Sequence, residues 1–149
     1  MADWRQELDS IFEGRARAAR AEQENAEFDA FLDGVALPAL QDLAQEFNGR
    51  HEMDARVRRA PGAAAIAVYG DGVEEINFRI LKHYCQNGIL PSAGVRVNRG
   101  AYLARYEVMF KPDDDTDYRL SDVTKDDVIA CFLKYFRMVR DGGSPAGRA

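Results

Sequence analysis

The chain has 149 residues, 46% apolar and 30% charged, which is the size and composition of one ordinary globular domain. Because 20 Lys and Arg stand against 25 Asp and Glu, the net charge is −5, which argues against a general polyanion-binding domain but allows a local basic patch. No stretch approaches the ~18 consecutive apolar residues of a membrane span, and the first residues lack the apolar run of a signal peptide. We therefore expect a soluble, cytoplasmic protein.

Residues 1–24 are predicted to form an amphipathic helix or arm. Asp3 can cap this segment, and residues 15–27 contain no large apolar side chain, which indicates a solvated helix or a mobile arm. Gly14 predicts a break, because glycine costs about 1 kcal/mol relative to Ala inside a helix. The large apolar residues at helical spacing are Trp4, Leu8, Ile11 and Phe12.

A second apolar stripe predicts a helix from Phe28 to Phe47. Pro38 lacks the N–H that would bond to Gly34, so this helix should be kinked or restarted before the proline. Asn48 and Gly49 predict a left-handed stop. The members of the stripe are Phe28, Phe31, Leu32, Val35, Ala39, Leu40, Leu43 and Phe47.

After Gly49 apolar residues recur at every second position, which predicts β-strands. The connections between these strands are too short for a crossover helix, so the strands are predicted to be antiparallel. Residues 86–94 contain Asn87-Gly88 and Pro91 and are predicted to be a loop. The predicted inward-facing residues of the first four strands are Met53, Ala55, Val57, Ile66, Val68, Ile76, Phe78, Ile80, Val95 and Val97. A fifth strand is predicted over 101–111.

The C-terminal part is predicted to hold an acidic loop, a helix and a tail. Asp113 to Asp117 form the loop, and Thr124 caps the helix with Asp127 at the capping-box position. Residues 142–149 have nothing to bury and are predicted to be disordered. The predicted buried stripe of the helix comprises Val128, Ile129, Phe132, Leu133, Phe136 and Val139.

These elements predict an α+β, two-layer sandwich. A long, kinked N-terminal helix precedes a five-stranded antiparallel meander, and a C-terminal helix packs on the same sheet face. The predicted organisation is an arm over 1–24, a single domain over 25–141 and a tail over 142–149.

No metal or cofactor is expected from the sequence. His83 and Cys85 share a strand face, but His51 falls on the opposite face and no second closely spaced ligand pair accompanies them. Cys85 and Cys131 are therefore interpreted as free thiols. The acidic loop carries Asp at the first, third and fifth positions of a calcium loop, but lacks the later Gly and the bidentate carboxylate, which leaves a weak cation contact or a charged solvent-exposed loop.

No catalytic residue can be named, because the chain contains no nucleophile elbow, phosphate loop or zinc-protease motif. The sequence therefore favours a non-enzymatic domain. The alternative is a small-molecule-binding domain or enzyme with a pocket between sheet and helices, lined by Phe78, Tyr102, Tyr106 and Phe132.

Arginines from four strands are predicted on the sheet face opposite the helices. Such a face could bind a peptide or an acidic partner. Alternatively it is an ordinary solvated sheet face, whose Arg stems cover the strands and pair with Glu52, Asp54 and Glu107. Nucleic acid is disfavoured by the net charge and by the lack of neighbouring aromatics. The residues are Arg56, Arg58, Arg79, Arg96 and Arg105, accompanied by Tyr69.

The Trp4 to Phe12 stripe needs a surface to cover it. It either folds back onto its own sheet or pairs with a second copy of the chain. Membrane binding is disfavoured because Asp3, Glu7, Asp9 and Glu13 oppose an anionic lipid surface.

At the level of fold only, this order of elements on an acidic chain is similar to the chaperones of protein secretion, which dimerise and bind extended peptides. Those domains insert a helix where this chain has residues 86–94. Together these observations favour a cytoplasmic adaptor or chaperone-like domain that forms a homodimer and binds a protein or peptide.

Overall fold

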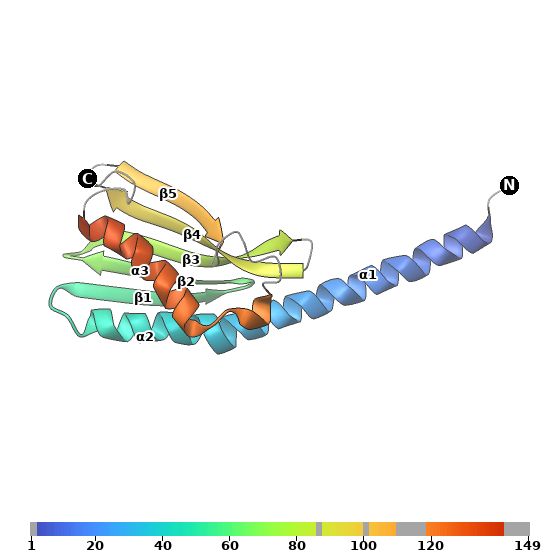
Figure 1. Cartoon of the computed structure of the whole chain (residues 1–149), viewed down its shortest axis with the longest axis horizontal. Coiled ribbons are helices and arrows are strands. Elements are labelled where there is room, and N and C mark those ends of the chain that lie inside the picture. Colours follow the sequence, from blue (N-terminus) through green and yellow to red (C-terminus); the bar gives the residue numbers. More distant parts are fainter. Residues whose placement is uncertain (1–2, 86–87, 100–101, 110–118, 142–149) are drawn as a thin grey trace.

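The structure, a computed structural model, describes residues 3–85, 88–99, 102–109 and 119–141. Its α+β architecture, with a long N-terminal helix, an antiparallel sheet and a C-terminal helix, confirms the predicted class. Helices α2 and α3 cover one face of the sheet, and α1 runs out beyond it (Figure 1). The elements are α1 (Trp4–Phe31), the π-helical turn η1 (Leu32–Ala36), α2 (Leu37–Asn48), β1 (Met53–Ala60), β2 (Ala63–Gly70), β3 (Val73–Cys85), β4 (Gly88–Arg99), β5 (Tyr102–Met109), the 3-10 turn η2 (Leu120–Asp122) and α3 (Lys125–Asp141).

Helix α1 is continuous, so the predicted break at Gly14 is wrong. The neighbouring Ala, Arg and Glu residues have high helix propensity, which outweighs the cost of one glycine. The predicted cap is confirmed, since the Arg5 N–H donates to Asp3 Oδ1 over 3.0 Å. Only the last turns of α1 reach the core, where Phe28 and Phe31 are buried.

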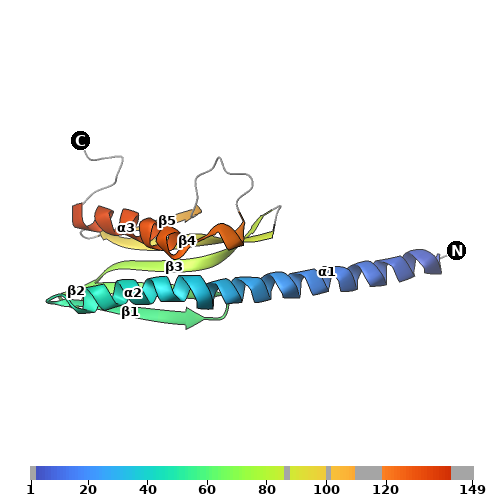
Figure 2. The same cartoon turned by 60° about the horizontal axis from the view of Figure 1, so that its bottom comes forward.

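The helical axis continues past Pro38 through a widened turn. The π-helical turn η1 precedes the proline, and the Leu37 N–H bonds to the Leu32 carbonyl. This turn accommodates the missing proline N–H without ending the helical run, and α1 and α2 lie nearly in line (Figure 2). The predicted stripe is buried apart from the half-buried Val35.

The connection from α2 to β1 differs from the predicted left-handed stop at Gly49. Gly49 has φ of −81° and lies in the right-handed region, whereas the positive φ of 62° falls on Glu52. The Asn48 side chain closes the connection instead. Its Oδ1 accepts from the Ala55 N–H over 2.8 Å, and its Nδ2 donates to the Ala55 carbonyl over 3.2 Å.

The sheet has the order β1-β2-β3-β4-β5, with every neighbouring pair antiparallel. The inward face forms the core with α2 and α3, and the predicted inward residues of its three middle strands are almost completely buried. These are Ile66, Val68, Ile76, Phe78, Ile80, Val95 and Val97.

The predicted loop over residues 86–94 is wrong, because β4 begins at Gly88. Pro91 lies within β4 opposite Lys82 of β3, and the pairing of β4 with β5 starts one residue later, at Ser92. Pro91 therefore occupies a part of the strand that has one described strand neighbour. A proline is tolerated at such a position because it need not donate to a second strand.

Helix α3 begins with the predicted capping box. The Thr124 N–H donates to Asp127 Oδ2 over 3.0 Å, and the Asp127 N–H donates to Thr124 Oγ1 over 3.2 Å. The predicted stripe is partly wrong, because Leu133 is 40% exposed while Tyr135 and Met138 are buried. The burial of two further residues shows that α3 lies deeper against the sheet than one narrow stripe indicates.

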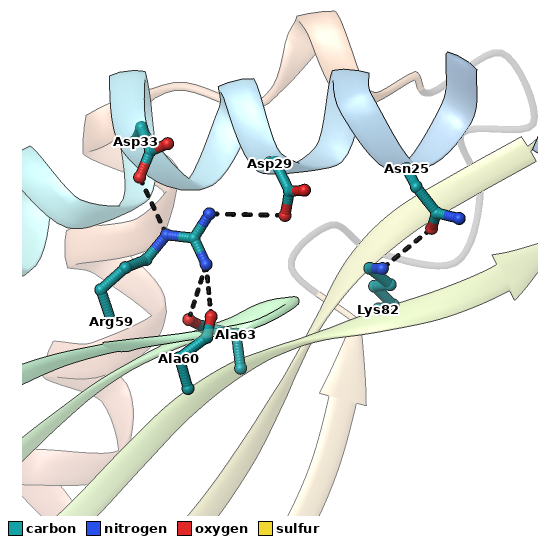
Figure 3. Close-up of polar contacts among 7 residues, drawn as sticks. All are labelled: Asn25, Asp29, Asp33, Arg59, Ala60, Ala63 and Lys82. Atoms are coloured by element: carbon teal, nitrogen blue, oxygen red, sulfur yellow. Dashed lines mark hydrogen bonds and ion pairs between the residues drawn. The ribbon is translucent and has the colours of Figure 1, made fainter. Parts of the chain in front are cut away.

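Polar contacts anchor the base of α1 to the sheet (Figure 3). Arg59 of β1 donates from Nε to Asp33 Oδ1 over 2.8 Å and from Nη2 to Asp29 Oδ1 over 3.4 Å. Lys82 of β3 donates from Nζ to Asn25 Oδ1 over 2.8 Å. These contacts set the direction in which α1 leaves the domain.

Two predictions lie outside the described residues: the acidic loop from Asp113 to Asp117 and the tail over 142–149. In the part of the chain that the structure describes, no helix combines the length and apolar character needed to cross a membrane.

Candidate functional site

The outer face of the sheet, opposite α2 and α3, carries the predicted arginines in two adjacent rows. Strand register aligns Arg56, Ala67, Asn77, Arg96 and Arg105 across the sheet. The next row along the strands aligns Arg58, Ala65, Arg79, Gly94 and Glu107, and the side chain of Glu107 lies outside the description. Alternation along each strand places both rows on the solvent side, because described neighbours in sequence such as Ile76, Phe78 and Val95 point into the core.

Small residues hollow this face between the arginines. Alanines on β2 and Gly94 on β4 form its floor, and a Cβ on Gly94 would lie 3.1 Å from the Leu81 side chain. Two adjoining depressions of about 350 and 250 Å³ share Asn77, Arg79 and Arg96. We name this feature the arginine hollow, lined by Arg58, Ala65, Asn77, Arg79, Gly94, Arg96 and Arg105.

Two of the predicted arginines are neutralised within the chain. Arg96 donates from Nη2 to Glu74 Oε1 over 2.7 Å, and Arg56 donates from Nε to Asp54 Oδ2 over 2.9 Å. The Arg56 guanidinium also lies 5.0 Å from the centre of the Tyr69 ring. These contacts match the expectation that part of this face is an ordinary network of surface ion pairs.

Arg58, Arg79 and Arg105 differ from that pair. All three are exposed, and among the described side chains none of them has a carboxylate within ion-pair distance. Three guanidinium groups beside a floor of small residues form a cationic depression on an acidic protein. Each guanidinium group can bind a carboxylate well, because its planar arrangement of N–H donors matches the two carboxylate oxygens.

Asn77 adds a polar atom that the sequence analysis did not single out. Its Oδ1 is buried and has no hydrogen-bond partner within the described part of the chain. A buried acceptor without a donor is costly to the folded state, and its burial keeps it out of contact with a ligand in the hollow. Strand alternation places Asn77 on the outer face, but only the tertiary structure shows that the atom is covered.

The predicted N-terminal stripe projects away from the sheet. Trp4 is 62% exposed, Leu8 43%, Ile11 54% and Phe12 59%, so the expectation that it folds back onto its own sheet is not met. The Arg5 guanidinium lies 4.8 Å from the Trp4 ring centre. The alternative, pairing with a second copy of the chain, stays a prediction.

The histidines and cysteines weighed above as possible metal ligands form no shared site among the described residues. Among described residues, no three His, Cys, Asp or Glu side chains are placed to share an ion. His51 precedes β1 and lies 3.3 Å from Glu52, whereas His83 lies near the far end of β3. Burial raises the pKa of the Cys131 thiol to about 11, which keeps it protonated and unreactive at neutral pH. The Cys85 side chain lies outside the description.

The pocket predicted between sheet and helices is occupied by core residues where the structure describes it. Phe78 and Phe132 are fully buried, and their ring centres lie 5.6 Å apart in an edge-to-face contact. The side chains of Tyr102 and Tyr106 lie outside the description.

A groove that the sequence did not predict lies beside the base of α1. It has a volume of about 830 Å³ and is formed by α1, the start of β4 and η2. No local pattern could reveal it, because its walls come from segments far apart in the sequence. The lining residues include Glu24, Glu27, Phe31, Val35, Ile89 and Arg119.

No protein-family model, curated protein or solved structure matches this chain. The fold-level similarity to secretion chaperones therefore gains no support from solved structures.

Proposed function

We propose that this protein is a non-enzymatic interaction domain that binds an acidic, extended segment of a partner protein in the arginine hollow. One observation carries the proposal: Arg58, Arg79 and Arg105 surround a small-residue floor without a carboxylate partner among the described side chains. The cytoplasmic location and the adaptor or chaperone-like role remain predictions.

The chemistry of the hollow supports a peptide more than a small anion. The three arginines are distributed over β1, β3 and β5, so one compact anion would leave most of them unused. An extended chain with spaced carboxylates can pair with several of them.

Nucleic acid is the less favoured polyanion. Single strands are bound by basic grooves combined with aromatic rings on which bases stack. Among the described outer-face side chains, Tyr69 is the one aromatic ring beside an arginine, and that arginine is Arg56, which already pairs with Asp54. The net charge of −5 also opposes a long polyanion.

The test is a fluorescence titration with a short labelled peptide in which Glu alternates with Ala. We expect the Arg79→Glu, Arg105→Glu double variant to weaken binding by at least about tenfold, because each charged hydrogen bond contributes about 1.5 to 3 kcal/mol. The Arg50→Glu, Arg137→Glu variant is the matched control, since it changes the net charge equally at exposed positions away from the hollow.

The proposal is overturned if the wild-type protein does not bind the peptide, or if both double variants bind it equally. It is also overturned if a single-stranded oligonucleotide of equal charge binds more tightly than the peptide.

A further inference from the structure

The two depressions of the arginine hollow have the same construction. The larger one, of about 350 Å³, lies over β2, where Ala65 stands between Arg58 and Arg79 in the strand register. The smaller one, of about 250 Å³, lies over β4, where Gly94 is flanked by Arg79 and, on β5, by Arg105 in the adjacent row. Each depression therefore has an exposed arginine on either side, and Arg79 is shared by both.

Small residues form the floor between these arginines. An added Cβ at Gly94 would lie 3.1 Å from Leu81 Cδ1, and Ala65 adds one methyl group to the floor of the larger depression. Arg96, which pairs with Glu74, also lines both depressions. An anionic group can therefore lie between two long arginine side chains in each depression, and the two oxygens of one carboxylate can accept hydrogen bonds from both.

The strand register fixes the distance between the two floors. Ala65 pairs with Arg79, and Arg79 pairs with Gly94, so the two small residues lie in one row on either side of β3. Neighbouring strands lie about 4.8 Å apart, which separates the floors by about 9.6 Å. The line that joins them runs perpendicular to the strands. Two carboxylates of one ligand have to match this distance and direction.

One extended peptide conformation matches the distance. In a β-strand, side chains on the same face are about 6.8 Å apart at every second residue and about 13.6 Å apart at every fourth. The polyproline II conformation has three residues per turn and rises about 3.1 Å per residue, so residues i and i+3 point the same way about 9.3 Å apart. The separation of the two floors therefore favours polyproline II over a β-strand.

We propose that the arginine hollow binds two carboxylates at positions i and i+3 of a polyproline II segment that lies across the strands. This inference rests on the proposed function, because it specifies which acidic segment the hollow binds. One carboxylate lies over Ala65 between Arg58 and Arg79, and the other lies over Gly94 between Arg79 and Arg105. The two residues between the carboxylates point away from the sheet, so proline is accepted there. The partner is a protein with an acidic, proline-rich segment.

Addition of a strand at the sheet edge is the other way to bind an extended segment. At the β1 edge, the N–H and the carbonyl of Ala55 already bond to the Asn48 side chain, over 2.8 and 3.2 Å. Backbone groups that are occupied in this way cannot join the hydrogen-bond ladder of an added strand. The exposed arginines lie on the face of the sheet, which is therefore the surface that an acidic segment contacts.

Two peptides of identical composition test the spacing. Glu-Pro-Pro-Glu and Pro-Glu-Glu-Pro, with blocked ends, carry the same charge, but only the first has its carboxylates three residues apart. Each is titrated into the full chain at low salt, and binding is followed by the NMR shifts of the arginine side-chain N–H groups. We expect the first peptide to bind at least about tenfold more tightly, because its second carboxylate binds within the same complex.

The outcomes separate this inference from the proposed function. Equal affinities of the two proline peptides, or binding of the alternating Glu and Ala peptide alone, overturn the spacing and leave the proposed function standing. Failure of all three peptides to bind overturns the proposed function as well.

Filling one depression without changing charge tests the two binding positions. We expect Ala65→Leu to reduce the tenfold preference for Glu-Pro-Pro-Glu to less than about twofold, because only one carboxylate position remains. Arg58→Gln leaves the floor unchanged and should reduce the preference in the same direction. The matched control is Ala67→Leu on the same strand face, since Ala67 is not among the described residues that line the two depressions. An Ala65→Leu variant that keeps the preference, or an Ala67→Leu variant that loses it, overturns the inference.

Discussion

Arg59 and Asp33 join the edge of the sheet to the turn at which the helical run widens. The Arg59 Nε lies 2.8 Å from Asp33 Oδ1, and the same guanidinium donates to the carbonyls of Ala60 and Ala63 in the β1-β2 hairpin. Asp33 raises the pKa of Arg59, and Asp29 adds to this effect. One side chain of β1 therefore holds the hairpin, the π-helical turn and the last turn of α1 in a fixed relation.

Replacing Arg59 with Met should lower the free energy of unfolding by about 1 to 2 kcal/mol, because several charged hydrogen bonds of a half-buried group are lost. The control is Arg58→Met. Arg58 is the neighbouring residue on the outer face, and its loss should change stability by less than about 0.5 kcal/mol. Urea unfolding followed by circular dichroism measures both. Equal destabilisation by the two variants would contradict this role for Arg59.

Phe132 joins α3 to the sheet and to α2. Its ring centre lies 5.6 Å from that of Phe78 on β3 and 5.8 Å from that of Phe47 on α2. We expect Phe132→Ala to cost about 3 to 5 kcal/mol, the range for a large buried aromatic residue. Leu133→Ala, at the adjacent 40% exposed position, should cost much less. Thermal unfolding of both variants measures the difference, and a larger loss from Leu133→Ala would refute this assignment of the core.

Glu52 and Asp71 bring two carboxylates together at one end of the sheet. Both residues have positive φ, 62° and 52°, and the Asp71 N–H donates to the Glu52 carbonyl over 3.0 Å. The side-chain hydrogen bond with Asp71, and then its charge, raise the pKa of Glu52 above its ordinary value of 4.5. The backbone bond between the two turns keeps these carboxylates close.

The stability contribution of Glu52 follows from the sign of this shift. A carboxyl group whose pKa is higher in the folded state contributes stability below pH 4.5, and this contribution is lost as the pH rises through the folded pKa. Glu52→Gln should therefore give a small increase in melting temperature at pH 7 relative to wild type, and this advantage should disappear below pH 4.5. Glu46→Gln is the control, because Glu46 lies beside a positive partner, Arg50, at 3.9 Å. A lower melting temperature for Glu52→Gln at pH 7 would contradict the prediction.

Local patterns in the sequence predicted the elements whose period is regular. The alternation of Ile76, Phe78 and Ile80 identified the buried face of β3, and the capping box at Thr124 identified the start of α3. Both signals act within a few residues, so they do not depend on the rest of the fold. The same alternation placed the arginines on the outer face.

Local signals failed where a neighbouring element overrides them. Pro91 indicates a loop by itself, but β3 supplies a partner strand and places the residue in β4. Leu133 fits the apolar period of α3, yet the angle at which α3 lies on the sheet exposes it and buries Tyr135 and Met138. Such angles are set by packing between elements, which no short window of sequence contains.

For this protein, the sequence by itself determined the order and type of most elements, the buried faces of the strands and the two faces of α1, because these follow from the period of the side chains along one segment. Only the tertiary structure decided that Arg58, Arg79 and Arg105 surround a hollow. It also decided that Asn77 Oδ1 is buried without a partner among the described residues, and that α1 leaves the domain with its apolar stripe uncovered. These properties depend on strand register and on contacts such as that of Arg59 with Asp33, which join residues distant in the chain.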